Sequence, residues 1–341
     1  MSSDRKNGGD HAVIPGQHSE GGQQSLVEEE YRAILNSGGV IARSTGVLSV
    51  TGRDVIDFFQ RMSTNDIHEI DSSGKNCVTV LTSEKGRILD VVTLLNVSGS
   101  FLVVTSPSNQ QKVKDWLEKY IVMEDVQITD VTCSYVMHTL IGLHVLESLS
   151  LPFKSVTGSN TFIHDIAHNG YLFKDEMWQI PVHNLISQSE ESRDLFHHVR
   201  QIQSETFDMI RIEQGIPFYG KEITDQVNPL EAGLSRFVSF TKGCYIGQEI
   251  IARLDTYAKL QKKLIGVIFD PLPKSVPSIG KILMEGKEVG FTSSHTWSMG
   301  LHKHIALGYA RTNMKSDSIE FRDELTGRSI PARFSQLPFI Q

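Results

Sequence analysis

A lone cysteine between two glycines is the feature of this 341-residue chain that is best suited to chemistry. It belongs to a run of eight residues, Lys242, Gly243, Cys244, Tyr245, Ile246, Gly247, Gln248 and Glu249. Apolar residues after Gly247 recur at helical spacing, so we predict a loop that places Cys244 close to a helix N-terminus. The helix dipole and the positive charge of Lys242 would both favour the nucleophilic thiolate. The alternative is a buried, inert cysteine beside a glycine turn, since free cysteine is often buried.

A carboxylate in an apolar strand is the second candidate. Asp90 lies in the strand expected at residues 88–95, among mostly apolar neighbours. A carboxylate on such a strand either faces solvent or occupies a site that raises its pKa. An acid with a raised pKa can take part in proton transfer.

The sequence carries no local metal motif. Cys77, Cys133 and Cys244 are far apart and form no Cys-x-x-Cys pair, so neither a zinc site nor a cysteine-held cluster is indicated. His197 and His198 are adjacent, and on a helix their side chains would point about 100° apart, away from any shared ion. We therefore expect no metal site. The sparse, odd number of cysteines is typical of a reducing compartment and predicts a cytoplasmic protein.

Composition excludes several classes of partner. The formal net charge is −7, so a nucleic-acid-binding surface is not expected. No apolar run approaches the roughly 18 residues that a membrane span requires, which predicts no membrane association. No glycine-rich phosphate loop of either standard spacing is present.

The expected elements favour an α+β fold in several domains. Residues 1–24 are rich in glycine and polar residues, and we expect them to be disordered. Residues 25–150 mix helical and strand periodicity without strict βαβ order. Residues 151–258 repeat this mixture loosely. Residues 259–341 consist of short strands broken by Pro, Gly and polar turns, which indicates a small β-barrel or sandwich.

The second of these segments is assigned four elements by its periodicity. Strands are expected at residues 161–166 and 178–182, and helices at 190–202 and 206–214. Gly215 and Pro217 would end the last helix. The segment could pair with the first one to form a pseudo-symmetric unit.

The run Lys242–Glu249 resembles the Lys-Gly-Cys-Tyr-x-Gly-Gln-Glu signature of the YgfZ family of folate-binding proteins, relatives of the glycine-cleavage T-protein, the aminomethyltransferase. Residues 211–217 resemble the family's Arg-x-Glu-x-Gly-x-Pro motif, and residues 228–234 its Pro-x-Glu-Ala-Gly-Leu block. Residues 50–54 and 63–67 resemble its opening motifs. The resemblance implies two mixed α/β segments of the aminomethyltransferase folate-binding type plus a C-terminal small β-barrel. It also implies tetrahydrofolate as the ligand and a role in making or maintaining iron–sulfur proteins.

Four departures separate this chain from the aminomethyltransferase branch. Paired acids are reduced to Asp90 followed by Val91, an asparagine is replaced by Thr105, and a glutamate is replaced by Gln179. The fourth departure is Cys244, which that branch lacks. For this reason we expect Asp90 to contribute to ligand binding more than to catalysis.

The resemblance also suggests residues that would contact folate. A carboxylate can accept both hydrogen bonds from the donor edge of a pterin, whereas Gln179 would weaken that recognition; Glu213 is a second carboxylate candidate. Arg211 and Arg253 are candidates for the anionic glutamyl tail, and Tyr219 for stacking on an aromatic ring. The alternative for each of these residues is an ordinary surface or packing role.

Three functions remain open at this point. The first is a tetrahydrofolate-binding YgfZ-type protein that supports assembly or repair of iron–sulfur proteins, with Cys244 as functional thiol and Lys242 tuning its pKa; Gln248 and Glu249 would fix the loop. The second is a tetrahydrofolate-dependent aminomethyltransferase of the glycine cleavage system. The third is a folate-binding module without chemistry.

Overall fold

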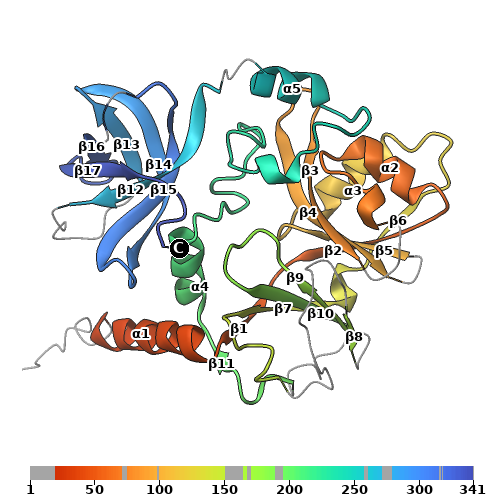
Figure 1. Cartoon of the computed structure of the whole chain (residues 1–341), viewed down its shortest axis with the longest axis horizontal. Helices are drawn as coiled ribbons and strands as arrows, with labels where there is room; N and C mark the ends of the chain where they lie inside the picture. The colour runs from red at the N-terminus through yellow and green to blue at the C-terminus, as the bar shows by residue number, and fades with distance from the viewer. Residues whose placement is uncertain are drawn as a thin grey trace, which may run out of the picture.

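The computed structural model describes residues 20–70, 75–97, 100–149, 164–166, 170–188, 195–256, 260–270, 279–314, 316 and 318–340. Within these residues the chain forms two sheets, several helices and a closed barrel, so the α+β prediction with a C-terminal β-barrel is confirmed. The barrel lies at one end of the molecule and the two sheets at the other, with α4 between them (Figure 1). The helices are α1 Glu20–Asn36, α2 Val55–Met62, α3 Gln110–Glu118, α4 Ser204–Glu213 and α5 Gln248–Thr256.

The first sheet has the strand order β3-β4-β5-β2-β6 among the described residues, and its neighbouring strands are antiparallel. Its members are β2 Gly46–Thr51, β3 Asn76–Thr82, β4 Ile88–Val97, β5 Ser100–Thr105 and β6 Gln127–Asp130. Helix α2 buries Val55, Phe58, Phe59 and Met62 against one face, as their helical spacing predicts. The β3–β4 hairpin expected at residues 77–95 is confirmed.

The second sheet has the order β11-β1-β7-β10-β9-β8 in the part of the chain that is described. It consists of β1 Gly39–Arg43, β7 Val136–Ile141, β8 His164–Ile166, β9 Gly170–Lys174, β10 Val182–Ser187 and β11 Arg200–Gln201. Strands β1 and β7 precede residue 150, so this sheet combines strands from both of the first two predicted segments. An apolar cluster that includes Val47, Leu102, Phe173 and Ile186 joins it to the first sheet. The domain boundaries given above remain predictions.

Two elements predicted in residues 151–258 are wrong. The segment at 178–182 is a turn that leads into β10, and its apolar Trp178 is buried against Phe207 rather than within a strand. The helix expected at 190–202 is replaced at its end by β11, which pairs in parallel with β1; residues 190–194 of this prediction lie outside the described residues. Long-range pairing overrides the helical spacing here. The helix at 206–214 is confirmed as α4, whereas of the strand at 161–166 only β8 is described.

The barrel closes through the strand order β12-β15-β14-β13-β16-β17. Its strands are β12 Lys262–Phe269, β13 Gly280–Met284, β14 Lys287–Ser298, β15 Lys303–Arg311, β16 Ser318–Asp323 and β17 Ser329–Ser335. Helix α4 packs against the barrel through Ile212, which contacts a cluster containing Ile268, Ile305 and Leu307. This packing fixes the barrel relative to the second sheet.

The N-terminal prediction needs one correction. Helix α1 begins at Glu20, so residues 20–24 are helical rather than disordered, while residues 1–19 lie outside the described part. The packed part of α1 provides the helix nucleus. Each residue added at its N-terminus then orders one residue and gains one hydrogen bond, which costs far less free energy than nucleation. Among the described residues no helix has the length and apolar character needed to cross a membrane.

Candidate functional site

The loop that carries Cys244 is fastened to the turn that follows α2. The Lys242 Nζ donates to the carbonyl oxygens of Ser63, at 2.9 Å, and Asn65. The Thr64 hydroxyl donates to the Phe237 carbonyl oxygen at 2.6 Å. Two motifs that are remote in sequence, residues 63–67 and 242–249, therefore form one unit.

Lys242 does not have the position expected of a residue that only activates the Cys244 thiol. Its ammonium group is directed at backbone carbonyls and lies 5.4 Å from the centroid of the buried Tyr245 ring. Burial lowers the pKa of Lys242 to about 8. The structure gives Lys242 a role in anchoring the loop, and its predicted effect on the thiol remains a prediction.

The Cys244 side chain is exposed, which removes the alternative of a buried, inert cysteine. Helix α5 starts at Gln248, four residues after the thiol, as predicted. Gly247 has a φ of +84°, and a Cβ there would lie 2.6 Å from the Ser83 carbonyl oxygen. The glycine therefore lets the loop pass closely over the β3–β4 turn.

A small inner cavity of about 130 Å³ lies where the two sheets meet α4. Its wall includes Val91 and Thr105 from the first sheet, Arg43 and Asn184 from the second sheet, Phe207 and Arg211 from α4, and Trp178, Asp175 and Tyr219 from connecting segments. The Tyr219 hydroxyl donates to Asn109 Oδ1 at 2.7 Å, so one edge of that ring is fixed beside the cavity.

Asp90 is fully buried just behind this wall. Its Oδ1 accepts hydrogen bonds from Val91 N at 2.8 Å and from the Ser106 hydroxyl at 2.6 Å, and its Oδ2 accepts one from Ser106 N at 3.0 Å. Burial raises the pKa of Asp90, and hydrogen bonds from Ser106 and Asn109 oppose that rise. Val91 and Ser106 line the cavity, whereas Asp90 does not. Asp90 therefore acts on the cavity through Ser106.

Arg211 and Glu213 are committed to partners within the protein. Arg211 is almost fully buried and forms an ion pair with the fully buried Glu222 at 3.1 Å. The Glu213 Oε1 accepts hydrogen bonds from the Ser298 hydroxyl at 2.6 Å and from Gly300 N at 3.1 Å. Burial raises the pKa of Glu213. These contacts join α4 to the barrel, and neither side chain is free to bind folate in the way that the sequence suggested.

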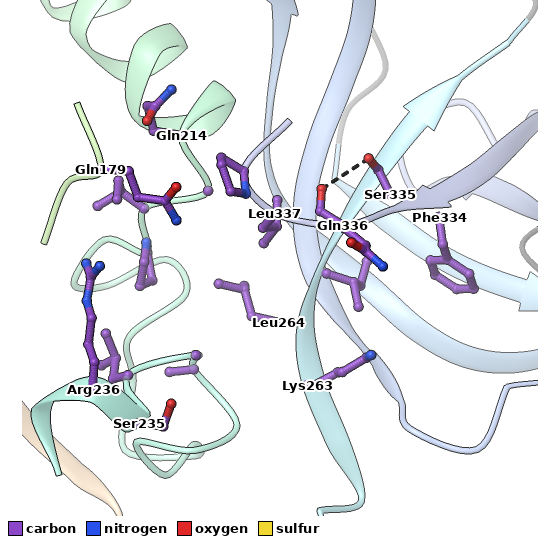
Figure 2. Close-up of a pocket in the computed structure, with 18 of the residues that line it drawn as sticks. Gln179, Gln214, Ser235, Arg236, Lys263, Leu264, Phe334, Ser335, Gln336 and Leu337 are labelled. Carbon is purple, nitrogen blue, oxygen red and sulfur yellow. Dashed lines mark hydrogen bonds between the residues drawn. The ribbon is translucent and has the colours of Figure 1, made fainter. Parts of the chain in front are cut away.

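A larger outer cavity of about 770 Å³ lies between the barrel and the segments that flank α4. Figure 2 shows Gln179, Gln214 and Arg236 on one side, facing Leu264 and Leu337 across it. Gln179 is exposed on this wall and does not line the inner cavity. Met177, Ile216 and Pro217 line both cavities, so the two adjoin.

The other sequence candidates divide between site and surface. Tyr219 lines the inner cavity, whereas Arg253 is exposed on α5 and lines neither cavity. Two charged residues that the sequence did not single out, Arg43 and Asp175, line the inner cavity. The available signal was their position at strand ends: Arg43 ends β1 and Asp175 follows β9 directly. Among the described residues no group of histidine, cysteine and acidic side chains could hold a metal ion.

Comparison with known proteins gives consistent matches. Residues 11–160 match the family described as GCVT N-terminal domain, and residues 262–341 match the glycine cleavage T-protein C-terminal barrel domain. An aminomethyltransferase of Aquifex aeolicus is 29% identical over 336 residues, which span 94% of this chain and 89% of that protein. An aminomethyltransferase of a Geobacillus species is 24% identical over 343 residues, spanning 94% and 92%.

Among solved structures, the glycine cleavage system aminomethyltransferase T from Bartonella henselae has the same fold. It aligns with a TM-score of 0.80 at 17% identity, over 92% of this chain and 89% of that one. The domain matches and the shared fold give this chain a GCVT N-terminal domain and a C-terminal barrel domain in an aminomethyltransferase-like fold, and they do not single out the YgfZ family.

Proposed function

We propose that this member of the aminomethyltransferase superfamily binds tetrahydrofolate across the inner and outer cavities and carries out one-carbon transfer of the aminomethyltransferase type. The observation that carries the proposal is the junction of a small and a large cavity along Met177, Ile216 and Pro217. Folate has the matching division into a compact pterin and an extended p-aminobenzoyl-glutamate tail. The inner cavity of about 130 Å³ is smaller than the roughly 300–1,000 Å³ of typical ligand sites, whereas the outer one falls within that range.

The aromatic and polar lining supports a pterin in the inner cavity. Trp178, Phe207 and Tyr219 provide aromatic surface for a flat ring. The Ser106 hydroxyl donates to Asp90, so its oxygen is left to accept a hydrogen bond from an N–H group of the ligand. Asp90 is then a positioning residue, since it orients Ser106 without lining the cavity.

Relatives support transfer chemistry more directly than they support a role in iron–sulfur proteins. The proteins of Aquifex aeolicus and Geobacillus described above are both aminomethyltransferases. In this reaction class the carbon of an S-aminomethyl group on a lipoyl carrier forms bonds to two nitrogens of tetrahydrofolate, while its bonds to nitrogen and sulfur break and release ammonia and the lipoyl thiol. Val91 in the cavity wall, in place of a second acid, would leave proton transfer to Ser106 and water, with Asp90 orienting Ser106.

A second candidate is the YgfZ-type function, in which tetrahydrofolate binding supports iron–sulfur client or assembly proteins. The exposed Cys244 in an anchored loop favours it. Cys244 lines neither cavity, so its thiol would act on a partner rather than on the bound pterin.

Calorimetric titration of tetrahydrofolate into the purified protein tests the common step. Formation of methylene-tetrahydrofolate from an aminomethyl-lipoyl carrier, measured with wild type and Cys244→Ser, then separates the candidates. Equal product formation by both proteins supports the transferase. Folate binding without product, together with loss of iron–sulfur enzyme activity in cells that carry only Cys244→Ser, supports the YgfZ-type function. If the wild type does not bind tetrahydrofolate, both candidates fail.

A further inference from the structure

Arg43 presents an unused guanidinium to the inner cavity. It is the last residue of β1, and its Cζ lies 4.3 Å from the centroid of the Phe207 ring and 5.9 Å from that of Phe218. Within the described part of the chain its nitrogens make no hydrogen bond or ion pair. The two rings hold the guanidinium in place through cation–π contacts and leave its N–H groups without acceptors.

Asp175 is the negative group of the same cavity. Its Oδ1 accepts a hydrogen bond from Met177 N and its Oδ2 accepts one from Asn184 Nδ2, both at 3.0 Å. The Asn184 amide is itself fixed, because its Oδ1 accepts from the Thr139 hydroxyl at 2.7 Å. The carboxylate is therefore rigid, and each oxygen keeps capacity for a further donor.

The two charges share the cavity without touching. Asp175 and Arg43 attract one another electrostatically but form no ion pair. Burial lowers the pKa of Arg43, and the charge of Asp175 works against that shift. Arg43 is half-buried, and the part of its hydration that is lost is not replaced by acceptors from the described residues, which is unfavourable. A ligand that offers an acceptor to Arg43 and donors to Asp175 would restore both sets of bonds.

We propose that Arg43 and Asp175 read the hydrogen-bonding edge of a 4-oxo pterin. Asp175 accepts from the 2-amino group and N3–H, and Arg43 donates to the adjacent 4-oxo oxygen. This assignment rests on the proposed binding of tetrahydrofolate. It replaces Gln179 and Glu213 as the candidates for the pterin edge, since Gln179 lies in the outer cavity and Glu213 is bonded within the protein.

The experiment compares two ligands that differ at the pterin 4-position. Tetrahydrofolate carries a 4-oxo acceptor and an N3–H donor, whereas tetrahydroaminopterin carries a 4-amino donor that would face the N–H groups of Arg43 and an unprotonated N3 that would face Asp175. A buried donor left without an acceptor weakens binding by roughly ten- to a hundredfold, so wild type should prefer tetrahydrofolate by about that factor. Dissociation constants are measured by calorimetry.

Arg43→Met keeps a long side chain against the two phenylalanine rings and removes all donors. We expect its preference for tetrahydrofolate over tetrahydroaminopterin to fall about tenfold, and the preference that remains comes from Asp175 and N3. Arg43→Lys retains a charged donor and should keep a preference between the two, which maintains the test if the methionine variant folds poorly. Asp175→Asn should weaken tetrahydrofolate more than tetrahydroaminopterin, because its amide nitrogen can donate to the unprotonated N3 of the analogue but opposes the N3–H of tetrahydrofolate. Arg328→Met, at an exposed position that lines neither cavity, is the matched control and should change nothing.

The outcomes separate this inference from the proposed function. If wild type binds tetrahydrofolate but Arg43→Met weakens both ligands equally, Arg43 is structural and the inference is overturned. If Arg43→Met weakens binding of the isolated fragment p-aminobenzoyl-glutamate, which has no pterin, then Arg43 binds the glutamyl tail. The inference is likewise overturned. If wild type binds neither folate ligand, the proposed function falls and the edge assignment falls with it.

Discussion

The substitution Arg211→Met tests whether the Arg211 guanidinium stabilises the fold or binds the ligand. Arg211 joins α4 to the barrel, and it donates to Glu222 Oε2 at 3.1 Å, the Ile216 carbonyl oxygen at 3.1 Å, Ser294 Oγ at 2.8 Å and the Asp208 carboxylate. Its side chain and that of Glu222 are almost fully buried. Arg211→Met would leave the Glu222 carboxylate buried without its counter-charge.

The expected loss follows from that uncompensated charge. Removing one partner of a buried ion pair costs about 3–5 kcal/mol of unfolding free energy. That is a large share of the roughly 5–15 kcal/mol that stabilises a typical protein. Glu222→Gln removes the charge on the other side, so the double variant Arg211→Met, Glu222→Gln should be less destabilised than the sum of the two single variants.

Urea unfolding followed by circular dichroism, without ligand, measures these differences. Arg253→Met, on the exposed face of α5, is the matched control and should change stability by less than about 0.5 kcal/mol. The reasoning is refuted if Arg211→Met destabilises the ligand-free protein by less than about 1 kcal/mol. A loss confined to tetrahydrofolate affinity would return Arg211 to the role of a folate ligand.

Three further predictions concern Lys242, Gly247 and the three cysteines. Burial lowers the pKa of Lys242 from 10.5 to about 8, so between these pH values the unfolded chain binds more protons than the folded protein. The stability of wild type relative to Lys242→Met should therefore rise with pH across that window. Urea unfolding midpoints of both proteins at about pH 7.5 and 9.5 check the sign. Gly247→Ala should cost at least about 1–2 kcal/mol, because alanine is strained at positive φ and its Cβ meets a backbone carbonyl; unchanged urea stability would contradict this. A thiol reagent should modify the exposed Cys133 and Cys244 in the native protein but Cys77 only after unfolding, because burial raises the pKa of Cys77 to about 12. Rapid modification of all three cysteines in the native protein would contradict the burial of Cys77.

The sequence predicts those elements whose apolar residues recur at the spacing of the face that they bury. The apolar spacing in α2 and the hairpin of β3 and β4 correspond to the structure because each buries its apolar face within one sheet layer. The turn at 178–182 and the strand β11 could not be predicted in this way. Their conformation depends on β1 and α4, which are distant in the sequence.

The sequence by itself indicated the short C-terminal strands, the glycine-flanked thiol and the helix that follows it, since these depend on residues a few positions apart. Closure of the barrel depends on distant pairs such as Gly266 with Ser335. Only the tertiary structure decided which charges face the cavity. Arg211 and Glu213 belong to a conspicuous motif, yet Glu222 neutralises Arg211 and groups of the barrel satisfy Glu213. Arg43 and Asp175 come from separate strand ends and meet only when the second sheet forms. Hydrogen bonds and ion pairs act over a few ångströms in space, so residue spacing along the chain does not reveal which charges they leave free.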